Sequence, residues 1–478
     1  MSGLRVSMVG FDIAPRFHPE YGAWGTTPVI TETDMPLLTR CLALEQDGRL
    51  LIWFSHDLCG NSITETDSFR DEMAGALKLN RDQVIWSTSQ THSSPTFPGS
   101  NLPGGSGITT RGIFDEEFSE KQRKRFLENC IDAAKKAIDG LQPADVWVGK
   151  GYCDSISYNT RFPMPTGGVK FSRDHEEGLQ SGKYFDPTIG LVRFDDKKGK
   201  PIGTIFNFCS HPATMINDKY LSSDFVGTAR EFIEDETGGA PAMFIQGFCG
   251  DVNCYFIFGK PEQAKTTGAR LGKAAVQGIR KMVPVRGVPF RYAWHQTELP
   301  CRDMFNEEQL RYEIDIRRTF QKKLDENPSA CWVGGINVAE FLSVEQKKAF
   351  VEINIKYCEE GLRMLNAGEI PPSSLSITLG AVRIGDLYAV LSPGENFALT
   401  GKEIRERSPF THTLICGDTN GLFGYIGNDE EINRGGYETD TFWKMLYCDG
   451  FRLALAEGSA QKVISAGLSL LNKLENDY

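Results

Sequence analysis

The sequence predicts an α/β fold of mixed, layered sheets with flanking helices. Short apolar runs typical of strands alternate with amphipathic stretches typical of helices. Two pairs of apolar runs are joined by turns that favour antiparallel hairpins, which a purely parallel sheet would lack. With 478 residues, of which 40% are hydrophobic, the chain is long enough to bury a large core.

The two hairpins are expected over residues 41–54 and 380–392. Their turns fall at Asp47-Gly48 and Gly385-Asp386, residue types that tolerate the positive φ of a tight turn. Further buried strands are expected at Val84–Ser87, Val146–Val148, Gly190–Phe194, Ile202–Cys209 and Met243–Gln246.

Helices are expected where apolar residues recur every three or four positions, over 116–141, 225–235 and 264–282. The stretch 307–367 is charged and favours helix throughout. We interpret the chain as one catalytic domain, residues 1–478, with 307–367 as a helical insertion and no C-terminal sandwich domain. A cluster of prolines between 285 and 305 marks the one candidate domain boundary.

Charge and composition exclude several classes of function. The net charge of −11 would repel nucleic acid. The N-terminus lacks the apolar run of a signal peptide, and no stretch approaches the roughly 18 apolar residues that a membrane span needs. Twelve scattered cysteines without a CxxC pair suit reduced thiols. We therefore expect a cytoplasmic protein that binds neither nucleic acid nor membranes; a homo-oligomer remains open.

Chemistry is expected at the polar ends of apolar strands, because a strand fixes such side chains rigidly. Five stretches qualify: 84–95 with His92, 205–215 with His211, 243–253 with Asp251 and Asn253, 389–397 with Glu395, and 414–431 with Asp418, Asn420 and Tyr425.

Each of these residues alone also has a structural explanation. A lone histidine is often only hydrogen-bonded, and Glu395 could cap a helix over Asn396–Arg405. In combination, two histidines, a carboxylate and neutral oxygen donors are the ligand types of catalytic zinc. The remaining histidines are expected to be structural or exposed: His18, His175, His295 and His412.

Seven motifs, in order over roughly residues 8–445, resemble the catalytic domain of the neutral/alkaline ceramidase family. They are FDIAP (11–15), STSQTHSSP (87–95), SYNTR (157–161), NFCSHPATM (207–215), QGFCGDVN (246–253), SPGENF (392–397) and NGLFGYIGNDEE (420–431).

The resemblance implies functional residues. The zinc ligands would be Gln90, His211, Glu395 and Tyr425. His92 and Arg161 would contact the reacting carbonyl, and Tyr437 matches a second tyrosine of the family. Substrate contacts are further expected from Asp224, Asp251, Asn420 and Glu438.

Two departures set this chain apart from that family. Asn253 stands where the family has a nucleophilic serine, and an amide cannot take that role. Gln90 stands where the family has a zinc histidine, and an amide oxygen binds zinc more weakly than imidazole does. The chain therefore resembles branches of the superfamily that are not established ceramidases.

Three functions follow as hypotheses. The first is a metal-dependent hydrolase of a soluble polar amide or sugar-derived substrate, and not of ceramide. The second is a carbohydrate-active enzyme, a glycoside hydrolase or lyase, that works without zinc through carboxylates chosen from Asp57, Asp224, Asp251, Glu395 and Glu438. The third is a non-catalytic binding protein.

Overall fold

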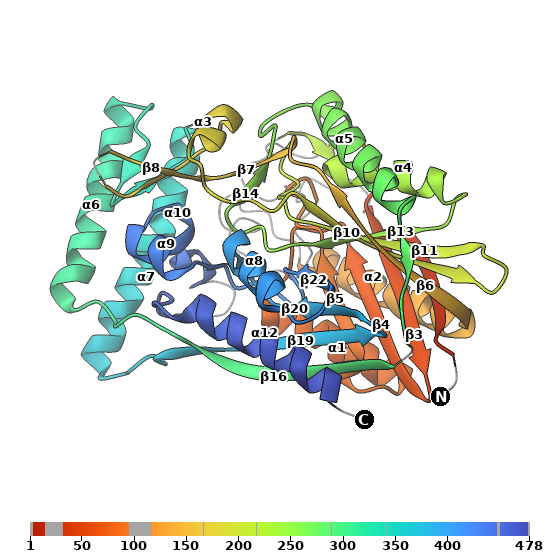
Figure 1. Ribbon diagram of the computed structural model, residues 1–478. Helices are drawn as coiled ribbons and strands as arrows, with labels where there is room; N and C mark the ends of the chain where they lie inside the picture. Colours follow the sequence, from red (N-terminus) through yellow and green to blue (C-terminus); the bar gives the residue numbers. More distant parts are fainter. Residues whose placement is uncertain are drawn as a thin grey trace.

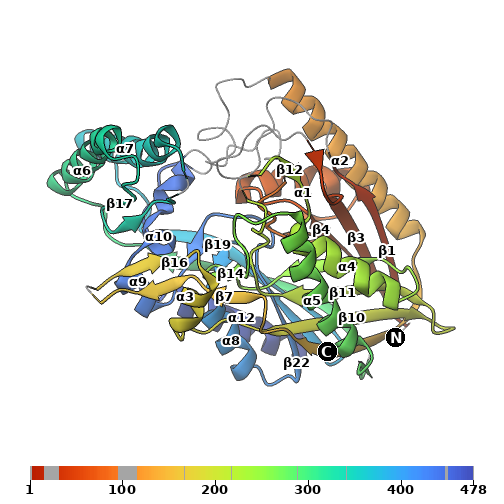
Figure 2. The same cartoon turned by 90° about the horizontal axis from the view of Figure 1, so that it is seen from above.

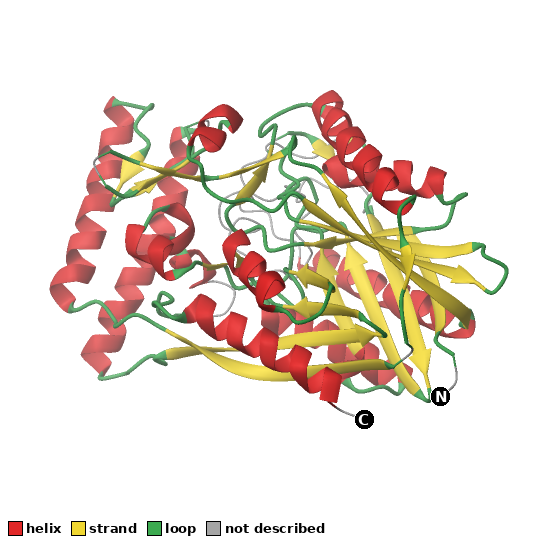
Figure 3. Cartoon of the chain, viewed as in Figure 1, coloured by secondary structure: helices red, strands yellow, loops and turns green. Residues whose placement is uncertain are grey.

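Two stacked sheets form the centre of the protein. The computed structural model describes residues 3–14, 32–94, 116–165, 167–216, 218–287, 289–340, 342–446 and 450–476. Figure 1 traces the chain through these elements, and Figure 3 shows the strands gathered in one half of the molecule with helices around them.

Among the described residues, the larger sheet has nine strands of mixed direction. Its order is β13 (Ala242–Gln246), β11 (Pro201–Phe208), β10 (Thr188–Asp196), β6 (Gln142–Tyr152), β1 (Arg5–Asp12), β3 (Leu38–Gln46), β4 (Arg49–His56) and β5 (Val84–Thr88), with β15 (Val283–Pro284) beside β6. The pairs β11–β13 and β4–β5 are parallel, and the others are antiparallel.

The second sheet has four strands among the described residues. Its order is β16 (Phe290–Pro300), β19 (Ser374–Ile384), β20 (Leu387–Leu391) and β22 (His412–Cys416), of which only β20 and β22 run parallel. Because β16 is a full edge strand of this sheet, the proline-containing stretch 285–305 is not a linker.

Alternating side chains pack the two sheets into layers. Leu44 and Trp53 of the larger sheet share one core with Val382 and Leu414 of the smaller sheet. Helices cover the two outer faces: α1 (Ile63–Leu77), α2 (Glu116–Asp139), α4 (Asp224–Glu236) and α5 (Pro261–Ile279) on the larger sheet, and α8 (Ala398–Arg407) and α12 (Ser459–Asn476) on the smaller. The predicted mixed, layered α/β fold is therefore confirmed.

Both predicted hairpins are present. The turn at Asp47-Gly48 joins β3 to β4 with φ angles of 50° and 80°, and the turn at Gly385-Asp386 joins β19 to β20 with φ of 59° at the glycine. These are the positive φ values that the turn residues predict.

The stretch 307–367 is helical as predicted. It contains α6 (Glu307–Glu326), β17 (Trp332–Val333), β18 (Ile336–Asn337) and α7 (Val344–Ala367). Figures 1 and 2 both place α6 and α7 side by side at one end of the molecule, beyond the edge of the sheets. The pair has a core of its own, in which Phe350 packs against Trp443. That this stretch is an insertion into a single domain stays a prediction.

Short elements make up the rest of the described structure. They are β2 (Glu32–Thr33), η1 (Arg81–Gln83), β7 (Ser157–Asn159), β8 (Arg161–Pro163), β9 (Val169–Phe171), α3 (His175–Gln180), β12 (Tyr220–Leu221), β14 (Val252–Cys254), β21 (Glu395–Asn396), β23 (Tyr425–Ile426), α9 (Asp429–Arg434), α10 (Tyr437–Asp440) and η2 (Phe442–Met445).

Two further observations bear on the expected environment. Every cysteine in the described part of the chain is a thiol outside any disulfide, and most are buried. Within the same ranges, no helix combines the length and the hydrophobicity needed to cross a bilayer.

Candidate active site

A cavity of about 190 Å³ lies where the strand-end loops meet the helical pair. Eight of the twelve residues predicted from the sequence line it: Gln90, His92, His211, Asn253, Glu395, Tyr425, Tyr437 and Glu438. They come from stretches of chain separated by as many as about 350 residues, so only the tertiary fold brings them together. The cavity is therefore the candidate active site.

Backbone pairing aligns the central residues. Strands β21 and β23 run parallel and place Glu395 opposite Tyr425. His211 forms an isolated parallel bridge with Asn253, and its backbone N–H donates to the carbonyl of Val252 at 3.1 Å. Two short pairings thus position four candidate residues independently of their side-chain contacts.

His211 and Glu395 face each other in an arrangement that calls for a cation. His211 Nδ1 lies 2.9 Å from the carbonyl oxygen of Val252, which can only accept, so Nδ1 carries the proton of the neutral ring. Nε2 then presents a lone pair at 3.4 Å from Glu395 Oε2, a buried oxygen with no hydrogen bond among the described residues. Two acceptors at this distance repel each other unless a proton or a metal ion lies between them.

The spacing fits a zinc ion. Two ligands of a tetrahedral zinc, each bonded at about 2.0–2.1 Å, are about 3.3 Å apart. A metal-bound histidine commonly donates its other ring nitrogen to a carbonyl, as His211 does to Val252. Tyr425 hydrogen-bonds to Glu395, and burial with the nearby carboxylate raises the pKa of its phenol far above the usual range. A metal ion would lower that pKa again by favouring the phenolate.

Gln90 is the weak member of the predicted ligand set. It is buried, and its backbone adopts a φ of 63°, a strained conformation for a residue other than glycine. Its side-chain oxygen accepts from the thiol of Cys249 at 3.3 Å. In the described ranges, no three His, Cys, Asp or Glu side chains are grouped so that they could hold a metal. Of the four predicted ligands, only His211 and Glu395 are of these residue types. The other two, Tyr425 and Gln90, offer a phenol and an amide.

His92 lies beside His211, with 5.7 Å between the ring centroids. Burial, the neighbouring His211 and the charge of Lys444 all lower the pKa of His92, burial most strongly. The ring is therefore neutral at pH 7, but the lowered pKa also makes it a weak base, which could take a proton only from a water acidified by a bound cation.

Glu395 does not cap α8, the structural role that the sequence left open for it. The carboxylate of Asp251 does so instead, accepting from the N–H of Ala398 at 2.7 Å and from Asn159 Nδ2 at 2.7 Å. Burial raises the pKa of Asp251 to about 6. Asp251 does not line the cavity, so the structure does not bring it together with the other candidate residues, and its contact with substrate stays a prediction.

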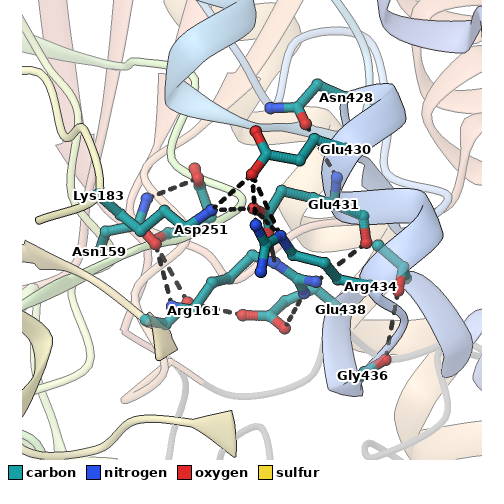
Figure 4. A network of polar contacts seen from close by, with 12 residues as sticks. Asn159, Arg161, Lys183, Asp251, Asn428, Glu430, Glu431, Arg434, Gly436 and Glu438 are labelled. Carbon is teal, nitrogen blue, oxygen red and sulfur yellow. Dashed lines mark hydrogen bonds and ion pairs between the residues drawn. The ribbon is translucent and has the colours of Figure 1, made fainter. Parts of the chain in front are cut away.

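Arg161 is likewise not part of the cavity lining. Its guanidinium forms ion pairs with Glu431 and, at 2.7 Å, with Glu438, and it donates to the carbonyl of Gly435 at 2.6 Å (Figure 4). The Arg161 side chain is 0% exposed. Because its donors are engaged by these partners, the structure does not place Arg161 at a reacting carbonyl; instead it fixes α9 and α10 behind the cavity.

Two other residues predicted to contact substrate, Asp224 and Asn420, hydrogen-bond to nearby backbone groups. The carboxylate of Asp224 accepts from the N–H of Met215 at 3.0 Å and from Phe225 N–H at 2.6 Å. Asn420 Oδ1 accepts from the N–H of Trp86 at 3.0 Å. Neither side chain lines the cavity, because local backbone groups use their oxygens.

The sequence did not single out several cavity residues. Arg173 and Lys444 contribute cationic groups, and Lys444 Nζ lies 3.2 Å from the hydroxyl of Tyr437. An apolar wall comes partly from the helical stretch and consists of Phe171, Ile216, Ile257, Val338, Leu342 and Phe350. The one available signal was a lysine inside the apolar run Phe442–Leu446.

The layered α/β fold of this chain is shared with solved structures. The structure is similar to the neutral ceramidase from Pseudomonas aeruginosa, with 17% identity and a TM-score of 0.66 over 98% of this chain and 75% of that one. It is also similar to a ceramidase complexed with C2, with 17% identity and a TM-score of 0.70 over 99% of this chain and 75% of the other. No family model matches the sequence. The predicted resemblance to neutral ceramidases is thus confirmed at the level of the fold.

Proposed function

We propose that the protein is a metal-dependent hydrolase of an amide bond, or of a related acyl bond, in a soluble substrate other than ceramide. The observation that carries this proposal is the pair of acceptors, His211 Nε2 and Glu395 Oε2, at 3.4 Å beside Tyr425. These three residues would hold a zinc ion, with Gln90 as a weaker fourth ligand. Zinc bound there would supply a Lewis acid for the substrate carbonyl.

The remaining cavity residues suggest how the chain supports hydrolysis. Asn253 cannot attack the substrate, so water is the nucleophile, and the Asn253 amide is available to orient it by hydrogen bonds. His92, neutral at pH 7, would accept a proton from that water and return it to the leaving group. The hydroxyl of Tyr437, which accepts from Lys444, supplies a donor for the developing oxyanion.

The apolar wall refines the substrate. A fully polar amide or sugar would leave Phe171, Leu342 and Phe350 without a partner, whereas a substrate with one apolar arm would bury their surface. We therefore propose a soluble amide whose reacting end is polar and whose acyl arm is apolar.

The carboxylates favour this proposal over a zinc-independent glycosidase. Of the five carboxylates considered for that alternative, only Glu395 and Glu438 line the cavity. Glu438 accepts from Arg161 with one oxygen and from the hydroxyl of Thr160 at 2.6 Å with the other, so both oxygens are already engaged by the protein. Asp57 is paired with Arg230.

Metal analysis tests the proposal directly. Purified protein dialysed against buffered zinc should retain about one zinc ion per chain, and His211→Ala and Glu395→Gln should each weaken zinc binding by at least about tenfold. The exposed His295 of β16 provides a matched control, since His295→Ala should leave binding unchanged. Zinc content that is equal in all four proteins would refute the site. Hydrolysis of glycosides but not of acyl amides or esters by the zinc-loaded protein would refute the reaction.

A further inference from the structure

Two cations meet at one aromatic residue of the cavity. Lys444 Nζ lies 3.2 Å from the hydroxyl of Tyr437 and 4.4 Å from the centre of its ring. The Arg173 guanidinium lies 4.6 Å from the ring of Phe171, which in turn packs 4.9 Å from the ring of Tyr437. Arg173 and Tyr437 also interact electrostatically. We call Arg173, Tyr437 and Lys444 the cationic wall.

The carboxylates that line the cavity compensate these charges only in part, since Glu438 interacts with Arg173 electrostatically without forming a salt bridge to it. Both oxygens of Glu438 are engaged, Oε1 by Thr160 and Oε2 by Arg161. Glu395 faces His211 and Tyr425. Among the described residues, neither Arg173 nor Lys444 forms a salt bridge.

The hydrogen bonds of the two cations are to neutral groups. Arg173 Nη1 donates to the amide oxygen of Asn337 at 2.9 Å, a contact that fixes the guanidinium against β18. Lys444 donates to the phenol of Tyr437 and lies 5.3 Å from the ring of Tyr425. Burial lowers the pKa of Arg173, and the opposing effect of Glu438 and Glu340 is too small to balance the lost hydration. An anion in the cavity would balance it.

The cationic wall is close enough to the reacting centre to contact a substrate bound there. Tyr425, which hydrogen-bonds to Glu395, lies with its ring 6.5 Å from the ring of Tyr437. Tyr425 therefore interacts both with Glu395 of the His211–Glu395 pair and with Lys444, which lies 5.3 Å from its ring. A group held by Lys444 would be separated from the scissile bond by only a few bonds.

We propose that the substrate carries an anionic group, a carboxylate in the simplest case, bound by Lys444 and Arg173 a few bonds from the scissile amide. The inference rests on the proposed function and names its substrate class: an N-acylated amino acid or a similar acyl amide with an acidic leaving portion. The acyl arm occupies the apolar wall, and the acidic portion occupies the cationic wall. A neutral amide would form no ion pair with either Lys444 or Arg173.

A matched pair of probes tests this inference. N-hexanoylglycine and N-hexanoylglycinamide have nearly the same shape, but only the first carries a negative charge. Their dissociation constants are measured by calorimetry on the zinc-loaded His92→Gln variant, which lacks the proposed base and keeps the proposed metal ligands, and their kcat/KM values are measured on the unmodified enzyme. Binding of the acid should be at least about tenfold tighter than binding of the amide, as expected for charge-assisted hydrogen bonds in a half-buried site.

Variants assign the preference to the cationic wall. Lys444→Met should reduce it to less than about threefold, Lys444→Arg should retain most of it, and Arg173→Gln should weaken it. Lys462→Met, on the exposed face of α12, is the control and should not change it.

Failure of this inference can be distinguished from failure of the proposed function. Equal binding of both probes, tighter binding of the neutral amide, or no binding of either would overturn the inference even if other amides are hydrolysed. A preference for the acid that Lys444→Met abolishes would support it even if neither probe is cleaved, and the absence of cleavage would then count against the hydrolase alone.

Discussion

Replacing Arg161 by methionine should destabilise the protein severely. The Arg161 guanidinium is 0% exposed and neutralises two buried carboxylates, Glu438, which is 0% exposed, and Glu431, which is 5% exposed. Removing one partner of a buried ion pair costs about 3–5 kcal/mol, because the remaining charge stays buried and unpaired. Glu431 keeps Lys183 as a second cation, so most of the cost should come from Glu438. We therefore expect a loss of about 4 kcal/mol in unfolding free energy for Arg161→Met.

The assay is urea unfolding followed by tryptophan fluorescence. The control is Arg311→Met on the surface of α6, where an exposed i,i+4 pair with Glu307 should change the unfolding free energy by about 0.5 kcal/mol or less. Combining Arg161→Met with Glu431→Gln and Glu438→Gln should restore part of the stability, because no unpaired charge then remains. If Arg161→Met instead abolishes hydrolysis while its unfolding midpoint matches the control, Arg161 contacts the substrate and the positioning role argued from Figure 4 is refuted.

Two further outcomes are expected. Gln90→His should tighten zinc binding by at least about tenfold if the four-ligand pocket is intact, because imidazole is a better zinc ligand than an amide; an unchanged dissociation constant for zinc would show that position 90 does not reach the metal. Burial lowers the pKa of His56 to about 3, from a usual value of about 6.5. The unfolded chain therefore takes up a proton at this residue before the folded protein does, and stability that is present above about pH 6.5 is lost as the pH falls towards 3. The total loss is about 5 kcal/mol. His56→Phe should flatten the fall in unfolding free energy between pH 6.5 and 4, and parallel curves for the two proteins would contradict this.

The fold was predictable where local chemistry decides the backbone. The turns at Asp47-Gly48 and Gly385-Asp386 follow from which residues tolerate positive φ. The strand runs and the amphipathic helices follow from the periodicity of apolar side chains. The order of strands within each sheet was not predictable in this way, because it depends on pairings between residues far apart in the chain.

The candidate site was predictable only in part, because sequence does not reveal which partner a carboxylate or guanidinium finds. Asp251 and Glu395 both follow strands, yet Asp251 turns to an N–H 147 residues away and caps α8, while Glu395 faces the cavity. Arg161 resembles a catalytic arginine in sequence, but its guanidinium forms ion pairs with Glu431 and Glu438. The apolar wall was missed because its residues carry no reactive groups and come from a helical stretch that shows its role only after folding.

The backbone geometry around the cavity supports the proposed hydrolysis by water. Glu395 and Tyr425 are fixed relative to each other by the β21–β23 pairing, and His211 is fixed by its bond to the carbonyl of Val252, so the proposed metal half of the cavity depends on backbone geometry. Asn253 is held by the same kind of bridge to His211, and its backbone position is therefore preserved while the side chain cannot become covalently acylated. The proposed metal would supply the electrophile, and the Asn253 side chain cannot attack the substrate. The nucleophile must therefore be a molecule from outside the protein. We infer that direct attack by water, assisted by a neutral histidine, is the chemistry that this arrangement is suited to perform.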